Sequence, residues 1–132
     1  MDEKGRVSLP SAFRRDPGTE RFVLLQWEQS HLALFPEKKW EEVQGRLLEY
    51  RRSDPQGWNR VRAIVANATE VAPDKQGRIL VPAALQAAAG LEGTVLVSGN
   101  IDRVELWSPE TYGRSVEEQA GDLSEYAHRL FG

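Results

Sequence analysis

One nine-residue segment occurs twice in this chain, first as Asp2-Glu3-Lys4-Gly5-Arg6-Val7-Ser8-Leu9-Pro10 and again as Asp74-Lys75-Gln76-Gly77-Arg78-Ile79-Leu80-Val81-Pro82. The two copies lie 72 residues apart. The same spacing aligns, without a gap, Leu25 with Val97, Leu34 with Leu106, and Trp40 with Tyr112. Internal similarity at a fixed spacing indicates two structurally equivalent units in one chain.

Each copy of the segment predicts a tight turn, a short strand and the start of a helix. Asp can hydrogen-bond its own backbone two residues on, and Gly accepts a positive φ. Alternate apolar residues after the glycine then share one face of a strand. The closing proline, Pro10 or Pro82, suits the first turn of a helix because its missing N–H costs nothing there. We therefore expect short helices over residues 11–15 and 83–89.

A β-hairpin and further helices are predicted after each motif. The hairpin strands are expected at residues 22–27 with 32–35, and at 94–98 with 103–107. The helices are expected at 36–52 and 56–66 in the first unit, and from 109 and at 122–130 in the second. The spacing of Leu123, Tyr126 and Leu130 predicts that the last helix is amphipathic and packed.

The two units are not equal at their starts. Residues 67–72, which precede the second motif, read as a strand with β-branched residues, whereas only Met1 precedes the first motif. We expect the first unit to lack this leading strand, through truncation or a misplaced start.

Composition limits the possible functions. The 132 residues are 40% hydrophobic and 28% charged, which is ordinary for a globular protein. The chain has no cysteine and only two histidines, His31 and His128, so thiol catalysis is excluded and no metal or cofactor is expected. We find no secretory signal and no apolar run long enough for a membrane span, so the expected location is the cytoplasm. No catalytic constellation is present, and we expect neither an enzyme nor a small-molecule substrate.

Charge is distributed unevenly along the chain, although the net charge is −3 from 17 basic and 20 acidic residues. Residues 60–78 carry four basic and two acidic side chains, whereas residues 92–132 carry three basic and eight acidic ones. Since local potential governs docking to a polyanion, the C-terminal region is expected to lie away from any nucleic acid.

The doubled Asp-x-Lys-Gly-Arg-apolar-x-apolar-Pro motif, followed by Val104-Glu105-Leu106-Trp107, resembles the MraZ family of the SpoVT–AbrB fold group. The resemblance implies an α+β fold in which two tandem AbrB-like swapped-hairpin units form one pseudo-symmetric β-barrel-like domain with flanking helices. The units would be residues 1–66 and 67–132. It further implies a ring-shaped homo-oligomer. Members of the family bind double-stranded DNA at repeated promoter sites ahead of the division and cell-wall gene cluster, usually as repressors, which implies a nucleoid-associated protein.

Arg6 and Arg78 are the first candidates for DNA contact, because each follows a turn glycine and can project from the start of a rigid strand. The planar guanidinium fork suits phosphate or guanine. The alternative is that each arginine pairs with the aspartate of its own motif, Asp2 or Asp74, and only holds the turn closed.

Four further basic residues are candidates: Lys4, Lys75, Arg14 and Arg15. The lysines suit phosphate contacts, which position the protein without reading sequence, or are simply exposed solubilising residues. The two arginines would extend the basic strip, but Gln86 and Ala87 stand at the equivalent positions of the second unit.

Two interpretations of the function remain open. So few cationic contacts predict weak binding by one chain, and an oligomer on repeated sites would raise the avidity. The alternative is an antitoxin-like or protein-interaction member of the same fold group, with the acidic C-terminal region docking a basic partner. The four tryptophans and two histidines are interpreted as packing or surface residues.

Overall fold

Two antiparallel sheets form the centre of the computed structural model, which describes residues 1–13, 21–119 and 122–132. The elements in chain order are β1 (Arg6–Ser8), the 3₁₀ helix η1 (Ser11–Phe13), β2 (Phe22–Leu25), β3 (Leu32–Pro36), α1 (Glu37–Ser53), α2 (Gly57–Val65), β4 (Thr69–Val71), β5 (Arg78–Leu80), α3 (Ala83–Ala88), β6 (Leu96–Asn100), β7 (Arg103–Trp107), α4 (Pro109–Gln119) and α5 (Leu123–Phe131). The α+β class predicted from the sequence is confirmed.

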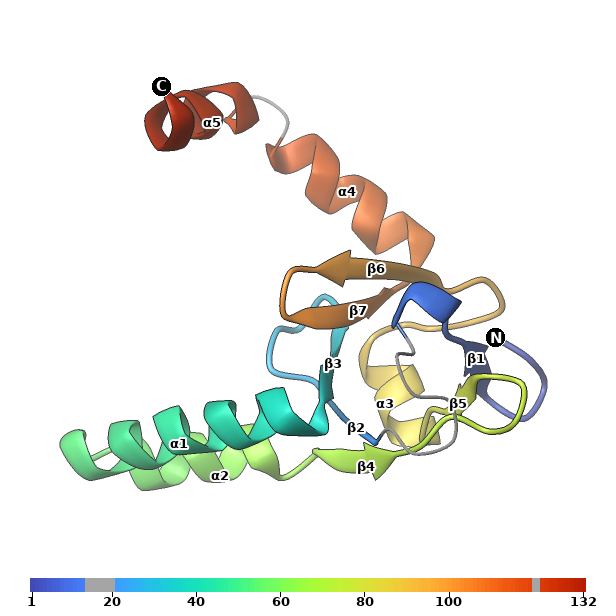
Figure 1. Cartoon of the computed structure of the whole chain (residues 1–132), viewed down its shortest axis with the longest axis horizontal. Coiled ribbons are helices and arrows are strands. Elements are labelled where there is room, and N and C mark those ends of the chain that lie inside the picture. Colours follow the sequence, from blue (N-terminus) through green and yellow to red (C-terminus); the bar gives the residue numbers. More distant parts are fainter. Residues whose placement is uncertain (14–20, 120–121) are drawn as a thin grey trace.

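Both sheets join the two halves of the chain (Figure 1). The smaller sheet pairs β1 with β5, which are the strands of the two repeated segments. The larger sheet has the order β4-β2-β3-β7-β6, so the two hairpins meet at β3 and β7. Each half therefore completes the hydrogen bonding of the other, and neither sheet belongs to one repeat alone.

The register of these pairings reveals a pseudo-twofold axis. Val7 lies opposite Ile79 in the smaller sheet, and Ala33 lies opposite Glu105 in the larger one. Both pairs join residues 72 apart, which is the spacing of the sequence repeat. Two residues at equivalent positions of the repeats can lie directly opposite each other in an antiparallel pair only if a twofold axis passes between them. The two halves of the chain are therefore related by a pseudo-twofold axis at both sheets.

The equivalence of Leu25 with Val97, expected from the ungapped alignment, is wrong by one residue. Leu34 pairs with Leu24, whereas its counterpart Leu106 pairs with Val97, so Val97 corresponds to Leu24. Side-chain packing agrees with this correspondence. Leu24 and Val97 both pack in the core cluster between the two sheets, whereas Leu25 packs in the cluster on the opposite face of the larger sheet. A slip of one residue exchanges the faces of a strand, so the core face fixes this register.

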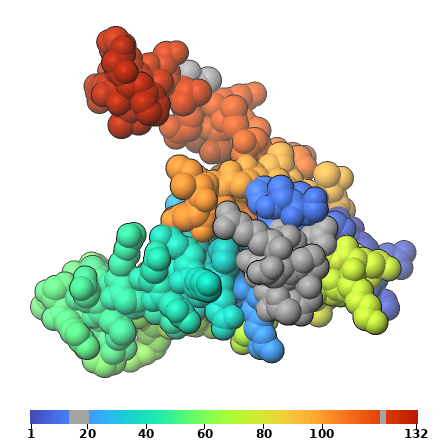
Figure 2. Space-filling view, in the orientation of Figure 1, coloured from blue at the N-terminus to red at the C-terminus, as the bar shows by residue number. Residues whose placement is uncertain are grey.

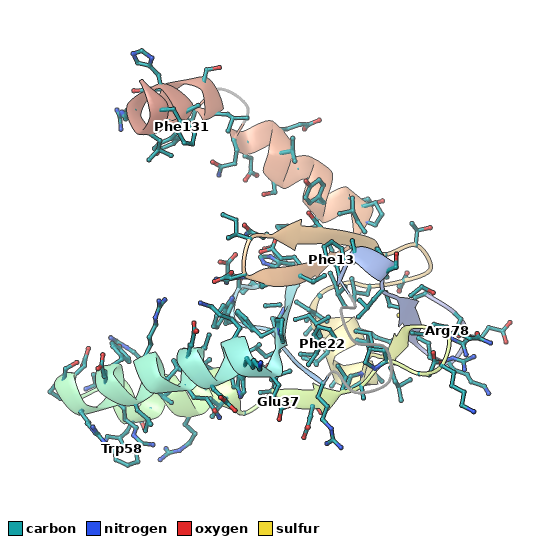
Figure 3. All side chains as sticks on the ribbon, viewed as in Figure 1. Phe13, Phe22, Glu37, Trp58, Arg78 and Phe131 are labelled. Carbon is teal, nitrogen blue, oxygen red and sulfur yellow. The ribbon has the colours of Figure 1, made fainter. Side chains whose placement is uncertain are left out.

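The main core lies between the two sheets. The inward residues of the small sheet, Val7 and Ile79, pack with Phe22, Leu24 and Leu106, all of which are almost fully buried. Figure 3 shows Phe22 in this central position. A second cluster covers the opposite face of the larger sheet, where Trp40 and Val43 of α1 pack on it. Strands β2 and β3 are thus buried on both faces, which explains their continuous apolar sequences.

The helices of the two halves are arranged differently. α1 and α2 pack as an antiparallel pair, whereas α4 and α5 extend away from the sheets (Figures 1 and 2). The helix predicted at 122–130 is present as α5, but the prediction that it packs is wrong within the described residues. Its Leu123, Tyr126 and Leu130 are 69%, 54% and 74% exposed.

Three other features differ from the sequence prediction. The sheets do not close into a barrel, because β4 and β6 are open edges of the larger sheet among the residues described. The short helix expected at residues 11–15 is the single 3₁₀ turn η1, and the rest of that range lies outside the described residues. The second hairpin turns at Ile101 and Asp102, with Ile101 at a φ of 56°, so β6 ends at Asn100, two residues beyond the predicted strand end.

Removing side-chain volume at the pseudo-twofold axis is expected to destabilise both halves together. Ile79→Ala should lower the free energy of unfolding by about 2–5 kcal/mol, because Ile79 is fully buried between the sheets. Leu130→Ala removes a large apolar side chain at a residue that is 74% exposed on α5 and should change it by less than about 0.5 kcal/mol. Urea denaturation measures both, and equal effects of the two variants would contradict this account of the core.

Candidate nucleic-acid interface

The first repeated segment folds into a turn organised by one carboxylate. Oδ1 of Asp2 accepts hydrogen bonds from the backbone amides of Lys4 at 3.0 Å and Arg6 at 2.8 Å. Oδ2 accepts one from Nε of Arg6 at 2.7 Å. The backbone amide of Gly5 donates to the Asp2 carbonyl at 3.1 Å, and Gly5 has a φ of 84° that favours glycine. The aspartate thus fixes both the turn and the arginine side chain.

The second segment repeats this turn. Oδ1 of Asp74 accepts hydrogen bonds from the backbone amides of Gln76 and Arg78, both at 2.9 Å, and Oδ2 accepts one from Nε of Arg78 at 3.0 Å. Gly77 has a φ of 77°. We refer to residues 2–6 and 74–78 as the two Gly-Arg corners. Their equal hydrogen bonding explains why Asp, Gly and Arg recur at the same spacing.

The two Gly-Arg corners hold each other in place. The amide of Leu9 donates to the carbonyl of Gly77 at 2.9 Å, and the amide of Val81 donates to the carbonyl of Gly5 at the same distance. Gly5 is also enclosed, because a Cβ there would lie 2.3 Å from Nε2 of Gln86. Gln86 in turn donates to the carbonyl of Val81 at 2.8 Å. The corners and the β1–β5 ribbon therefore form one rigid unit.

The arginine side chains lie side by side at one end of the molecule. Val7 and Ile79 face the core, so Arg6 and Arg78 project from the opposite, outer face of the ribbon. Nη1 of Arg78 lies 3.8 Å from Oδ2 of Asp2 in the other corner. Figure 3 shows Arg78 at the end of the molecule remote from Trp58 and Phe131. The structure thus brings the two leading candidates together.

The alternative pairing of each arginine with its own aspartate is present, but it leaves donors available. The pairs engage Nε, and the side chains of Arg6 and Arg78 remain 29% and 25% exposed. Within the described residues, no hydrogen bond engages the Nη groups of either guanidinium. A partly exposed guanidinium that is anchored through Nε keeps a fixed orientation, and its Nη groups can still donate hydrogen bonds to a ligand.

The carboxylates of both corners are held in the ionised form. The hydrogen bond from the backbone amide of Arg6 is the main cause that lowers the pKa of Asp2 below its ordinary 3.8, and the Arg6 guanidinium lowers it further. The backbone amide of Arg78 likewise lowers the pKa of Asp74, helped by the amide of Gln76. The corners therefore keep their charge pattern throughout the neutral range.

The other sequence candidates divide into two groups. Lys4 and Lys75 are exposed on the two corners, two residues before Arg6 and three residues before Arg78. Arg14 and Arg15 lie outside the described residues. Gln86, which contacts the first corner at Gly5, was not among the site residues predicted from the sequence. The sequence signal that could have identified Gln86 is its position in the helix directly after the second motif, four residues beyond Pro82.

The aromatic residues and histidines have packing or surface positions. Trp40 and Trp107 are buried, and His31 stacks on Trp107 with ring centroids 4.1 Å apart. Trp58 is exposed beneath the guanidinium of Arg51, and His128 is exposed on α5. The residues described hold no group of three or more His, Cys, Asp or Glu placed to bind a metal ion. None of the helices described is long and apolar enough to cross a membrane.

The fold and this site define an internally duplicated α+β protein with two arginine-bearing corners on one rigid β-ribbon. The family model described as "MraZ protein, putative antitoxin-like" matches residues 1–57 and 64–132. The chain belongs to the MraZ family.

Curated relatives carry the name "Transcriptional regulator MraZ". The protein of Leuconostoc citreum (strain KM20) is 33% identical over 130 residues, which is 98% of this chain and 90% of that protein. The protein of Thermomicrobium roseum (strain ATCC 27502 / DSM 5159 / P-2) is 36% identical over 130 residues, covering 98% of this chain and 91% of that protein. The similarity therefore extends over both halves of the chain.

The lowered pKa values of Asp2 and Asp74 predict how acid affects the corners. Because these carboxyls are more acidic in the folded state, they stabilise it above about pH 4, and this stabilisation is lost as the pH falls through the lowered pKa values. The double variant Asp2→Asn, Asp74→Asn should be less stable than the unmodified chain at pH 6 and approach it near pH 2. Thermal unfolding across this range measures the difference. Glu3→Gln, at an exposed residue of the same corner, is the control and should show no such convergence.

Proposed function

We propose that this protein is a sequence-specific DNA-binding transcriptional regulator whose DNA-contacting surface is the pair of Gly-Arg corners. The observation that carries the proposal is the placement of two Asp-anchored, partly exposed arginines on one face of a rigid β-ribbon. The naming of the relatives as transcriptional regulators supports it.

The β1–β5 ribbon enters the major groove, which is wide enough for a two-stranded β-ribbon. Arg6 and Arg78 direct their Nη groups at guanine edges or phosphates, while Asp2 and Asp74 set the angle of each guanidinium. Lys4 and Lys75 contact the backbone phosphates on either side, and Arg14 and Arg15 extend this strip. α4, which carries three glutamates and one arginine, leads away from the body of the molecule to α5 (Figure 2).

The biological role follows the family resemblance. The two repeats act as tandem AbrB-like units, residues 1–66 and 67–132, whose interleaved pairing supports a swapped-hairpin origin. The chain assembles into a ring that spans repeated promoter sites of the division and cell-wall gene cluster and represses transcription there, in the cytoplasm at the nucleoid. Repeated sites suit a chain that offers few cations per subunit.

Substitution of the corner arginines tests the proposed surface. Arg6→Ala and Arg78→Ala should each weaken binding to a labelled duplex from the protein's own upstream region by about 5–150-fold, because a lost bidentate contact costs about 1–3 kcal/mol. Fluorescence anisotropy measures the affinity, and light scattering verifies that assembly is unchanged. Arg46→Ala removes an exposed charge from α1 and serves as the control. Retained binding in both corner variants would refute the assignment.

Dependence on repeated sites tests the proposed assembly. A duplex with several copies of the upstream repeat should bind about 10² to 10⁴ times more tightly than a duplex with one copy, since linked contacts multiply. Its affinity should also fall more steeply with salt, because each additional phosphate contact adds about −0.9 to the slope. Equal affinity and equal salt slopes for both duplexes would contradict binding by an oligomer.

A further inference from the structure

The outer face of the β1–β5 ribbon carries an exposed apolar side chain among its polar ones. Alternate residues of each strand point outward, away from the main core. The outward side chains of β1 and β5 are those of Arg6, Ser8, Arg78 and Leu80. Leu80 is 57% exposed, whereas its neighbour Ile79 is fully buried. The ribbon therefore presents a leucine to solvent on the same face as the two arginines.

The register of the ribbon places Leu80 beside both arginine positions. Leu80 lies directly opposite Arg6 across the two strands, and it follows Arg78 by two residues along β5. Residues that are opposite each other, and residues two apart on one strand, are neighbours on one face of a sheet. Any ligand that contacts both arginines on this face therefore also covers Leu80.

The first half of the chain has a serine at the equivalent position. Ser8 precedes Leu80 by 72 residues, is exposed, and lies opposite Arg78. The pseudo-twofold axis thus exchanges one arginine with the other, but it exchanges a hydroxyl group with an isobutyl group. The outer face of the ribbon is symmetric in its arginines and asymmetric in its apolar content.

The base edges in the major groove differ in how they would meet a leucine. Adenine, guanine and cytosine present hydrogen-bond donors or acceptors there, whereas thymine also presents its C5-methyl group. A leucine pressed against a polar edge displaces water without replacing the hydrogen bonds of that water, which is unfavourable. Contact with the methyl group instead removes apolar surface from water on both partners. Thymine is therefore the base that a leucine at this position fits.

We propose that Leu80 is a specificity-determining residue that packs on the C5-methyl group of a thymine, next to the groups contacted by Arg6 and Arg78. The inference rests on the DNA-contacting surface proposed above and adds to it a preference for one base. Ser8 offers no equivalent apolar contact, so the preference concerns one side of the ribbon. The arginines hold the ribbon in the groove, and the leucine selects the base beside them.

Replacing thymine by deoxyuridine tests this contact, because the replacement removes the C5-methyl group and keeps the base pairing. Duplexes from the protein's own upstream region carry deoxyuridine at one thymine position at a time, in every copy of the repeat. At the contacted position the affinity of the unmodified chain should fall by about fourfold or more, which corresponds to the burial of one methyl group. Fluorescence anisotropy measures each affinity.

Variants of Leu80 should remove the difference between the two duplexes. Leu80→Ala and Leu80→Ser both shorten the side chain, and Leu80→Ser supplies the residue that the first half has. Because Leu80 is exposed, both variants leave the core packing intact. Leu48→Ala makes the same change at a leucine that is 40% exposed on α1, and it is the matched control that should keep the full thymine preference.

Each outcome separates this inference from the proposed function. If the unmodified chain shows no sensitive thymine, or if the Leu80 variants keep the same sensitivity, the thymine contact is refuted and the DNA-binding function stands. Loss of all binding in the Leu80 variants would assign the residue a structural role and would also overturn the contact. If the unmodified chain binds none of these duplexes, the proposed function itself fails, and this inference fails with it.

Discussion

The fold depends on a reciprocal pair of backbone hydrogen bonds between the two repeats. Leu9 donates to Gly77 and Val81 donates to Gly5, so each repeat supplies the acceptor that ends the other's strand. A three-residue strand such as β1 has too few contacts to be stable alone. Its pairing with β5, and the burial of Val7 and Ile79 beneath that pair, make the two repeats one cooperative unit.

This interlock also prepares the surface that we assign to DNA. The glycines adopt the positive φ that the turns require, the aspartates close the turns, and the same aspartates fix Nε of Arg6 and Arg78. A long side chain loses considerable rotamer entropy when it is fixed by a ligand. Because the aspartates anchor Nε of each arginine, part of this entropy is already lost on folding, and less remains to be lost on binding. The residues that define the fold and those that present the charges are therefore the same short motif.

The sequence was sufficient where local chemistry decides the structure. Asp-x-x-Gly-Arg specifies its turn without help from distant residues, so both corners could be predicted. The register of β6 could not, because Val95 to Val97 and Phe22 to Leu25 are apolar at every position compared, and an ungapped alignment therefore has no signal for a one-residue slip. The core face alone distinguishes the two registers. The spacing of Leu123, Tyr126 and Leu130 likewise predicts an amphipathic helix. It does not show whether the same chain provides a surface on which the apolar face of that helix packs.

The departures from symmetry are concentrated at the periphery of the second half. The pseudo-twofold symmetry is kept where β1 pairs with β5 and where β3 pairs with β7. A shift of one strand along the other at these pairings would leave buried backbone donors without acceptors. Around β6 the constraint is weaker, because its outer groups can bond to water and its side chains are only partly buried. α4 and α5 share this freedom, and the apolar face of α5 is exposed where α2 is packed on α1. Symmetry is thus enforced where burial is complete and relaxed where solvent can replace a partner.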